Sequence, residues 1–232
     1  MIINQFKYST DNLGYFIHSA TQGIAIDAGA VKDILGYAQK NNITIKYVAN
    51  THSHYDHTPG NEKLLKATNA QFIDCTKIKS DQKIDLDHEI LKIFHTPGHT
   101  YDSVCFACDD FLVTGDTLFN GTIGNCFSGD LDAFFHSLKR LISFPEKTKI
   151  YSGHDYVMES IQIAQDIENK NLYIKEYLKK YNPKLIVSTI KDELKVNPFL
   201  RFNEPGIIKN LEKKNMAVNT ELDRFKSIME SY

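Results

Sequence analysis

The 232-residue sequence lacks any uninterrupted apolar run that approaches the roughly 18–20 residues of a membrane-spanning helix. Its N-terminus, Met1-Ile2-Ile3-Asn4-Gln5, has no basic region followed by an apolar stretch, so no secretory signal is visible. Hydrophobic residues make up 42% and charged residues 24% of the chain, which are ordinary globular values and exclude wholesale disorder. We therefore expect a globular protein with no membrane partner.

The sequence also lacks a marked excess of either charge sign. Lys and Arg number 27 and Asp and Glu number 29, and the resulting net charge of −2 does not favour a nucleic-acid partner. The charges are unevenly distributed, because residues 1–169 carry 14 basic and 21 acidic side chains, whereas residues 170–232 carry 13 and 8. The hydrophobic pattern changes near residues 158–170 as well, so we predict a domain boundary there.

Only four cysteines are present: Cys75, Cys105, Cys108 and Cys126. Cys105 and Cys108 form a C-x-x-C, but they lie in an apolar run typical of a strand, where residues three apart point to opposite faces. This pattern predicts small buried side chains rather than a zinc site, which would need further ligands at matching spacing. Scattered thiols without a secretory signal are typical of the reducing cytosol, so we expect a cytoplasmic protein.

Short apolar runs dominate the first two thirds of the chain and alternate with segments of helical periodicity. Strands are predicted at 15–17, 23–27, 43–49, 71–74, 91–94, 104–107, 111–114 and 149–152. Helices are predicted at 31–41, 59–67, 131–142, 207–214 and 222–229, with one or two more within 161–181. Because the pattern contains both hairpins and crossovers, we expect mixed sheets and an α+β fold.

Three histidines and one aspartate fall within six positions of the segment Thr51-His52-Ser53-His54-Tyr55-Asp56-His57, directly after a predicted strand. In an extended loop, residues two apart lie on the same side, so His52, His54 and Asp56 can converge. His57 then approaches from the start of the next turn. Imidazole and carboxylate ligands suit zinc, iron or manganese better than calcium.

Three further segments place a His or an Asp at the end of a strand. They are Thr96-Pro97-Gly98-His99-Thr100, Thr114-Gly115-Asp116-Thr117 and Tyr151-Ser152-Gly153-His154-Asp155. Each segment is a weak signal alone, but four strand ends that each deliver a ligand are a strong joint signal. Seven ligands suffice for two metal ions that share a carboxylate and hold a bridging water as the nucleophile. The predicted set is His52, His54, Asp56, His57, His99, Asp116 and His154.

The series H-x-H-x-D-H, T-P-G-H-T, G-D-T and G-H resembles the metallo-β-lactamase superfamily, and within it the sequence is most similar to glyoxalase II (hydroxyacylglutathione hydrolase). Three segments carry the closer resemblance: Gly115-Asp116-Thr117-Leu118-Phe119, Gly153-His154-Asp155-Tyr156 and Asn197-Pro198-Phe199-Leu200-Arg201. The resemblance implies an α+β, four-layer αββα sandwich. It also implies a catalytic domain at residues 1–160 and a C-terminal helical substrate-binding domain at residues 161–232.

The resemblance further implies how the metal ligands are divided. One ion is expected to bind His52, His54 and His99, the other Asp56, His57 and His154, and Asp116 is expected to bridge them. We expect two divalent ions, zinc first, with iron or manganese also suited to these ligands. The expected reaction is hydrolysis of S-(2-hydroxyacyl)glutathione, a small thioester, by a bridging hydroxide that Asp56 orients. We expect the enzyme to act as a monomer.

One segment departs from the family pattern. Glyoxalase II usually has a Gly-Cys-Gly-Arg or Gly-Cys-Gly-Lys turn after Gly-Asp-Thr-Leu-Phe, and here Asn125 stands at the basic position. An amide offers hydrogen bonds but no charge-assisted pair with a carboxylate of glutathione. Tyr156 and Arg201 match positions that contact glutathione, so the resemblance implies substrate contacts by Asn125, Tyr156 and Arg201. The residues alone leave Arg201 equally open to a structural ion pair.

Two alternative functions stay open on the sequence. The first is hydrolysis of the thioester of a different small thiol, which Asn125 favours. The second is a persulfide dioxygenase-like oxidoreductase that holds a single iron, although the Arg-Thr-Asp turn of those relatives is absent here. A panel of thioesters would distinguish the first alternative, and a count of bound metal ions would distinguish the second.

Overall fold

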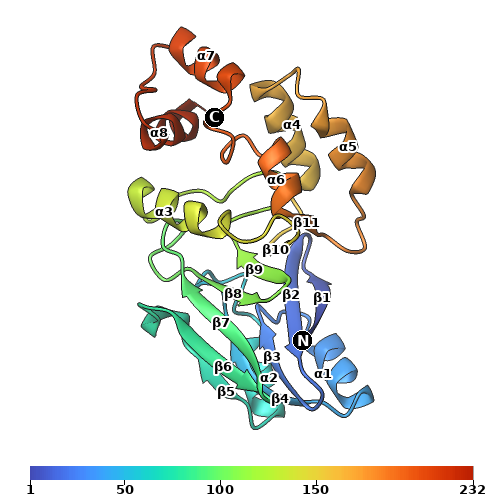
Figure 1. The fold of residues 1–232 in the computed structure, drawn as a ribbon. Coiled ribbons are helices and arrows are strands. Elements are labelled where there is room, and N and C mark those ends of the chain that lie inside the picture. The colour runs from blue at the N-terminus through green and yellow to red at the C-terminus, as the bar shows by residue number, and fades with distance from the viewer. Residues whose placement is uncertain (232) are drawn as a thin grey trace.

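Two β-sheets lie face to face, and helices cover the outer face of each, in the computed structural model of residues 1–231 (Figure 1). Side chains from both sheets form a central core between them, which includes Tyr15, Ile24, Phe106 and Val113. A second cluster lies between the first sheet and helices α1 and α2, and a third lies between the second sheet, α3 and the C-terminal helices. This arrangement confirms the predicted four-layer αββα fold.

The first sheet has the order β1-β2-β3-β4-β5 and mixes antiparallel with parallel pairs. β1, β2 and β3 pair antiparallel, whereas β3, β4 and β5 pair parallel and are connected through α1 and α2. The bounds are β1 Ile2–Tyr8, β2 Asn12–His18, β3 Gln22–Ile26, α1 Val31–Lys40, β4 Thr44–Ala49, α2 Asn61–Ala67 and β5 Gln71–Ile73.

The second sheet has the order β11-β10-β9-β8-β7-β6, and β9 with β10 is its one parallel pair. β7 is antiparallel to β8, and β8 is antiparallel to β9, so β7, β9 and β10 run in the same direction. Their carboxyl ends therefore lie at the same edge of the sheet. The bounds are β6 Gln82–Leu86, β7 Glu89–His95, β8 Val104–Cys108, β9 Phe111–Gly115, β10 Lys149–Ser152 and β11 Ser188–Thr189.

Within residues 1–231, six helices lie between or after the strands of the second sheet, and the last five gather at one end of the molecule beyond α3 (Figure 1). None of the helices among residues 1–231 combines the length and the apolar character that crossing a bilayer requires. The bounds are α3 Leu131–Leu141, α4 Val157–Ile167, α5 Tyr173–Lys180, α6 Ile190–Val196, α7 Pro205–Lys213 and α8 Glu221–Ser231.

Alternation of side chains along the strands explains the layers. In β8, Val104 and Phe106 enter the central core, whereas Cys105 and Ala107 face the third cluster under α3. Cys108 packs against the central core, so the two cysteines of the C-x-x-C point to opposite faces, as predicted. Each large apolar side chain buried in this way stabilises the fold by about 1.5–3 kcal/mol.

The predicted boundary between residues 160 and 161 falls inside α4. The hydrophobic clusters contain residues from both sides of it, because Tyr177 belongs to the central core and Phe225 belongs to the third cluster with Phe134. The C-terminal helices are therefore packed onto the β-sheets through shared cores. The division into two domains stays a prediction.

Most predicted elements are present, and the strands that the sequence did not predict share one property. β1, β6 and β11 are all edge strands of their sheets. An edge strand pairs on one side and buries less surface, so its hydrophobic alternation is weak: none of the seven residues of β1 is fully buried. The short helix α6 was not predicted either.

We predict that Phe225→Ala lowers the free energy of unfolding by about 3–5 kcal/mol, the usual cost of emptying a buried phenylalanine site. Phe225 is fully buried, and its ring centroid lies 5.5 Å from that of Phe135 and 6.2 Å from that of Phe134. Urea denaturation followed by circular dichroism measures the change. The matched control, Phe72→Ala, truncates a ring that is 44% exposed and should cost far less. Equal losses in the two variants would contradict the shared core.

Candidate metal centre and adjoining cavity

All seven side chains that the sequence predicted as metal ligands come together in the structure. Their ligand atoms form two groups, and within each group the atoms lie within 4.8 Å of one another. The first group contains His52, His54, His99 and Asp116, and the second contains Asp56, His57 and His154.

Strand direction explains why residues so far apart in sequence meet. His99, Asp116 and His154 follow β7, β9 and β10, whose carboxyl ends share one edge of the second sheet. The loop from His52 to His57 follows β4 of the first sheet and is joined to the second sheet, since the backbone N–H of Val104 donates to the carbonyl of Thr51 at 2.7 Å. The candidate ligands from both sheets therefore lie close together at this edge.

Hydrogen bonds on the outer side of three imidazoles fix their orientation. In each of the three, Nδ1 lies 2.9–3.0 Å from an oxygen acceptor, so it carries the proton and leaves Nε2 facing the centre. Such an outer partner is typical of metal-binding histidines. The pairs are His57 with the Asp27 carboxylate, His99 with the Asn125 carbonyl and His154 with the Asp11 carboxylate.

The inward nitrogens approach one another closely. His52 Nε2 lies 2.9 Å from His54 Nδ1, and His57 Nε2 lies 3.2 Å from His154 Nε2. Two unprotonated ring nitrogens repel each other at such distances, because both present a lone pair. A positive charge between them, either a proton or a metal ion, removes this repulsion.

The protonation states of these side chains also suit metal binding. Burial lowers the pKa of His52 to about 3, and burial also lowers the pKa of His99, so both are neutral imidazoles. Burial opposes protonation of His57 too, but Asp27 and Asp116 outweigh it and raise its pKa well above the usual value. Despite burial, His57 and the neighbouring imidazoles hold the pKa of Asp116 far below the usual range. The carboxylates of Asp27 and Asp116 therefore favour a positive charge at His57, which a proton or a metal ion can supply.

The carboxylate of Asp116 faces both groups, and one of its oxygens lacks a hydrogen-bond partner within residues 1–231. Its Oδ1 lies 3.4 Å from His57 Nε2, and its Oδ2 lies 3.5 Å from His154 Nε2 and 3.6 Å from His99 Nε2. Oδ1 is buried and has no hydrogen-bond partner within residues 1–231. A buried carboxylate oxygen without a partner is costly unless a cation neutralises it. The neutral imidazoles of His52 and His99, the ionised Asp116 carboxylate and its orphaned oxygen together fit a metal centre.

Residues outside the predicted set hold the ligands in place. Asp27 has a φ of 49°, and its carboxylate accepts hydrogen bonds from the backbone N–H and the hydroxyl of Thr51, at 2.8 and 2.7 Å. Asn12 donates to Asp56 Oδ2 at 3.1 Å. Sequence reasoning did not single out Asp11 and Asn12 for the site, because Asp11 lies 143 positions from its partner His154 and no local motif connects them.

A cavity of about 240 Å³ opens beside the metal centre. Tyr156 stacks on His154 with ring centroids 4.8 Å apart, and burial, followed by Asp11, raises the pKa of Tyr156 to about 12, so its phenol stays a hydrogen-bond donor. Asn125 lies on the exposed rim, and Glu159 is the charged residue of the lining. The lining residues are Phe119, Thr122, Ile123, Gly124, Asn125, Tyr156, Glu159, Ser160, Ile163, Phe199 and Met229.

Arg201 is not brought to this cavity. Its Nε donates to Glu168 Oε2 at 2.6 Å, Nη2 donates to Oε1 at 3.1 Å, and Nη1 donates to the carbonyl of Leu194 at 3.0 Å. The side chains of Arg201 and Glu168 are only 11% and 13% exposed. Arg201 lines a separate hollow of about 770 Å³, together with residues from the end of α4 to the start of α5 and from α7. These contacts are those of a structural ion pair, one of the two roles that the residues left open.

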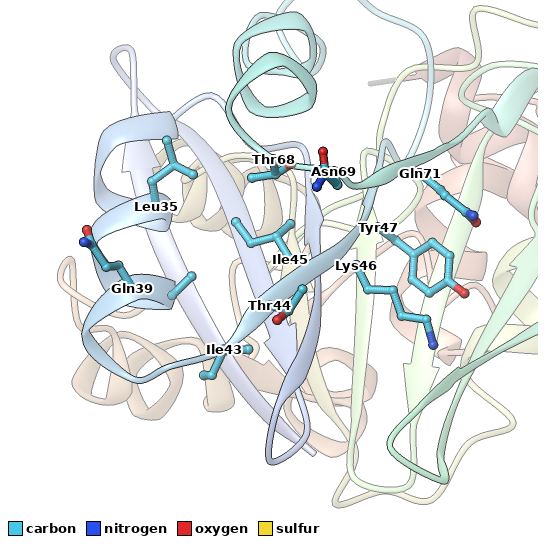
Figure 2. A pocket seen from close by; sticks show the side chains of 11 residues that line it. Leu35, Gln39, Ile43, Thr44, Ile45, Lys46, Tyr47, Thr68, Asn69 and Gln71 are labelled. Atoms are coloured by element: carbon cyan, nitrogen blue, oxygen red, sulfur yellow. The ribbon is translucent and has the colours of Figure 1, made fainter.

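Another hollow, of about 480 Å³, lies between α1 and the first residues of β4 (Figure 2). Leu35, Ile45 and Tyr47 give it a mainly apolar wall, and Thr68, after α2, and Gln71, at the start of β5, close it. The metal-centre loop follows the opposite end of β4, and none of the seven converging residues lines this hollow.

We predict that Arg201→Ala lowers the free energy of unfolding by about 3 kcal/mol, because it leaves the partly buried Glu168 without its partner. KM for an anionic thioester should stay unchanged. Thermal denaturation and steady-state kinetics on one preparation measure both quantities. A raised KM with unchanged stability would return Arg201 to the substrate site that the family resemblance implies.

Comparison with known protein families gives matches along almost the whole chain. The model of the metallo-beta-lactamase superfamily matches residues 15–73 and 76–154. The model described as the hydroxyacylglutathione hydrolase C-terminus matches residues 155–230. The first match contains all seven converging residues, and the second contains the helices that border the cavity.

Curated relatives and solved structures agree with these matches. A hydroxyacylglutathione hydrolase of Pelagibacter ubique (strain HTCC1062) is 39% identical over 223 residues, which cover 87% of this chain and 93% of that protein. One of Pseudoalteromonas translucida (strain TAC 125) is 34% identical over 234 residues, 93% of this chain and 91% of that protein.

Among solved structures, ETHE1 from Myxococcus xanthus has a TM-score of 0.73 at 23% identity and covers 100% of this chain and 91% of its own. A metallo-beta-lactamase from Staphylococcus aureus subsp. aureus COL has a TM-score of 0.70 at 18% identity and covers 100% and 67%. At these identities the solved structures show the fold alone. The fold, the two family matches and the curated relatives lead to one conclusion: the chain belongs to the hydroxyacylglutathione hydrolase family of the metallo-β-lactamase superfamily.

Proposed function

We propose that this metal-dependent hydrolase cleaves S-(2-hydroxyacyl)glutathione, such as S-D-lactoylglutathione, to glutathione and a 2-hydroxy acid. The observation that carries the proposal is the convergence of seven His and Asp side chains in two groups that Asp116 joins. The curated relatives, which bear the name hydroxyacylglutathione hydrolase, support the choice of substrate. The enzyme is proposed to act in the cytoplasm as a monomer.

The ligand roles proposed here follow the two groups. His52, His54 and His99 would hold one ion, Asp56, His57 and His154 the other, and Asp116 both. Zinc is the proposed metal, and iron or manganese suits the same imidazole and carboxylate donors. When bound, the two ions supply Lewis-acid chemistry, which lowers the pKa of a water molecule and polarises a carbonyl group.

The residues of the chain position the reactants. Asp56 is 30% exposed, and despite partial burial its pKa is lowered by His57 and by the amide of Asn12, so it is an ionised acceptor that can orient a water molecule. Tyr156 presents a phenol donor that can hold an amide of the substrate at the cavity wall. A thiol with a pKa of about 8.5 leaves readily as a thiolate, so no strong general acid is needed.

A different thiol carrier is the second candidate, and the lining of the cavity favours it. Glutathione carries two carboxylates, which cationic side chains bind best. Among residues 1–231, the cavity lining offers the neutral Asn125 and the anionic Glu159 but no Lys or Arg. A thioester with an uncharged carrier would meet no electrostatic penalty here.

We predict that Asp116→Ala abolishes hydrolysis, lowering kcat/KM by at least about a hundredfold, the scale of losing one preorganised electrostatic contact. Loss of the carboxylate that faces both groups should also lower the metal content, measured by elemental analysis of the same preparation. Asp110→Ala, which removes an exposed carboxylate from the turn between β8 and β9, is the control and should keep two ions and full activity.

Two results would count against this assignment. Full activity of a metal-depleted Asp116→Ala variant would refute the site. One iron per chain in the wild type, with no thioester hydrolysis, would favour the mono-iron oxidoreductase instead.

A second prediction concerns the carrier. Asn125→Lys adds a cation at the rim of the cavity and should raise kcat/KM for S-D-lactoylglutathione about fivefold at low salt, with the gain lost at high salt. The D-lactoyl thioester of N-acetylcysteamine, whose carrier is uncharged, is the control substrate and should show no gain. If the wild type cleaves the glutathione thioester much faster than the neutral one, and salt weakens that preference, the different-carrier candidate is wrong.

A further inference from the structure

Glu193 is a fully buried carboxylate in the middle of α6, and it lies outside the metal centre. Four donors surround it, two on each oxygen. Oε1 accepts hydrogen bonds from the hydroxyls of Tyr177 and Ser188, at 2.7 and 2.6 Å. Oε2 accepts from the backbone N–H of Gly121 at 2.8 Å and from the amide of Asn197 at 3.1 Å.

The four donors come from four different segments of the chain. Tyr177 belongs to α5, Ser188 to β11, and Asn197 follows the last residue of α6, whereas Gly121 belongs to the loop that leads away from Asp116. One carboxylate thus ties three elements of the C-terminal region to a loop of the catalytic region.

Burying this carboxylate is costly, and packing alone does not require it. Burial raises the pKa of Glu193 to about 6, although its hydrogen bonds act in the opposite direction. An apolar side chain of similar volume would fill the space but would leave the four donors without their acceptor. An apolar side chain also cannot form the hydrogen bonds that hold each donor segment in a defined position.

The loop held by Glu193 forms one wall of the substrate cavity. Asn197 links it a second time, because its amide also donates to the carbonyl of Thr122 at 2.9 Å. Phe119, Thr122, Ile123, Gly124 and Asn125 of this loop all line the cavity. The loop ends at Asn125, whose carbonyl accepts the hydrogen bond from His99 Nδ1 at 2.9 Å.

A second branch of the network reaches the other side of the metal centre. The amide of Asn120 donates to the Ser188 hydroxyl at 2.7 Å, and Asn120 Oδ1 lies 2.8 Å from the hydroxyl of Ser152. That hydroxyl also lies 2.9 Å from the carbonyl of His154. Asn120 and Ser152 are both buried, so the chain of contacts from Glu193 to His154 is shielded from water.

We infer that Glu193 is a positioning residue for the thioester, acting through Gly121 and Thr122 to fix the cavity wall. Its first effect is therefore on substrate binding, because His57 and His154 keep outer partners, Asp27 and Asp11, that lie outside this loop. The inference rests on the proposed function for its substrate, but the order of the loop can be measured without any substrate.

The test uses the metal-loaded full-length enzyme with Glu193→Gln. The amide that replaces one oxygen forces two partners to reverse from donor to acceptor, which only the hydroxyls of Tyr177 and Ser188 can do, and all four hydrogen bonds lose the charge assistance of the carboxylate. KM for S-D-lactoylglutathione should rise at least about fivefold, kcat should change less than twofold, and the metal content should stay as in the wild type. Hydrogen exchange at residues 119–125 should accelerate.

The matched control is Asp192→Asn, on the same helix. Asp192 forms a capping box with Thr189 and pairs with Lys180, so within residues 1–231 its hydrogen bonds stay in the C-terminal region and do not reach the loop. This variant should lose stability while KM and the exchange of residues 119–125 stay unchanged. A Glu193→Gln enzyme that also loses only stability would overturn the inference.

A second variant covers the case in which Glu193→Gln does not fold. Asn197→Ala removes the amide that joins Glu193 to Thr122 and should raise KM in the same way; an unchanged KM and unchanged exchange would overturn the inference. If the wild type does not hydrolyse the thioester, the proposed function fails. Faster exchange of residues 119–125 in Glu193→Gln but not in Asp192→Asn would still support the positioning role.

Discussion

The structure depends on one electrostatic constraint: ring nitrogens and carboxylates of seven residues meet in a largely buried space where they cannot all be satisfied by each other. His57 Nε2 and His154 Nε2 lie 3.2 Å apart, and a buried oxygen of Asp116 has no hydrogen-bond partner among residues 1–231. Such an arrangement is stable only with positive charge at its centre and rigid support around it. The support comes from outside the set, where Asp11 and Asp27 hold the outer nitrogens of the two histidines. Further support comes from β7, β9 and β10, whose carboxyl ends lie at one edge of the second sheet.

The sequence predicted the seven candidate metal ligands more completely than it predicted the strands of the two sheets. Ligand spacing is a local property, so the cluster from His52 to His57 and the strand-end residues His99, Asp116 and His154 could be read directly. The four layers were implied by the family resemblance, whereas alternation along the predicted strand at β8 placed Cys105 and Cys108 on opposite faces. The strands β1, β6 and β11 leave little hydrophobic pattern, because no residue of β1 is fully buried, three of the five residues of β6 are polar and β11 has only two residues.

Long-range partners mark the limit of prediction at the site. Asp11 supports His154 across 143 positions, and no motif of either segment encodes that contact. Arg201 illustrates the opposite case, in which a recognisable motif suggests a ligand contact. The guanidinium is engaged by Glu168, a residue 33 positions away in an unrelated loop, and the pair lines a different hollow. The motif alone did not distinguish a substrate contact from a structural ion pair, because Glu168 lies 33 positions away in the sequence.

This pairing changes how the basic C-terminal region is understood. This region carries 13 basic and 8 acidic side chains, yet the cavity beside the metal centre has Glu159 as its charged residue. The C-terminal helices instead contribute to the shape of the cavity. Phe199 and Met229 complete the cavity wall, and Glu193 holds the loop that begins beyond Asp116 and ends at the support of His99. The hydrogen bond from Gly121 to Glu193 is buried, so surface charges on the C-terminal helices take no part in it.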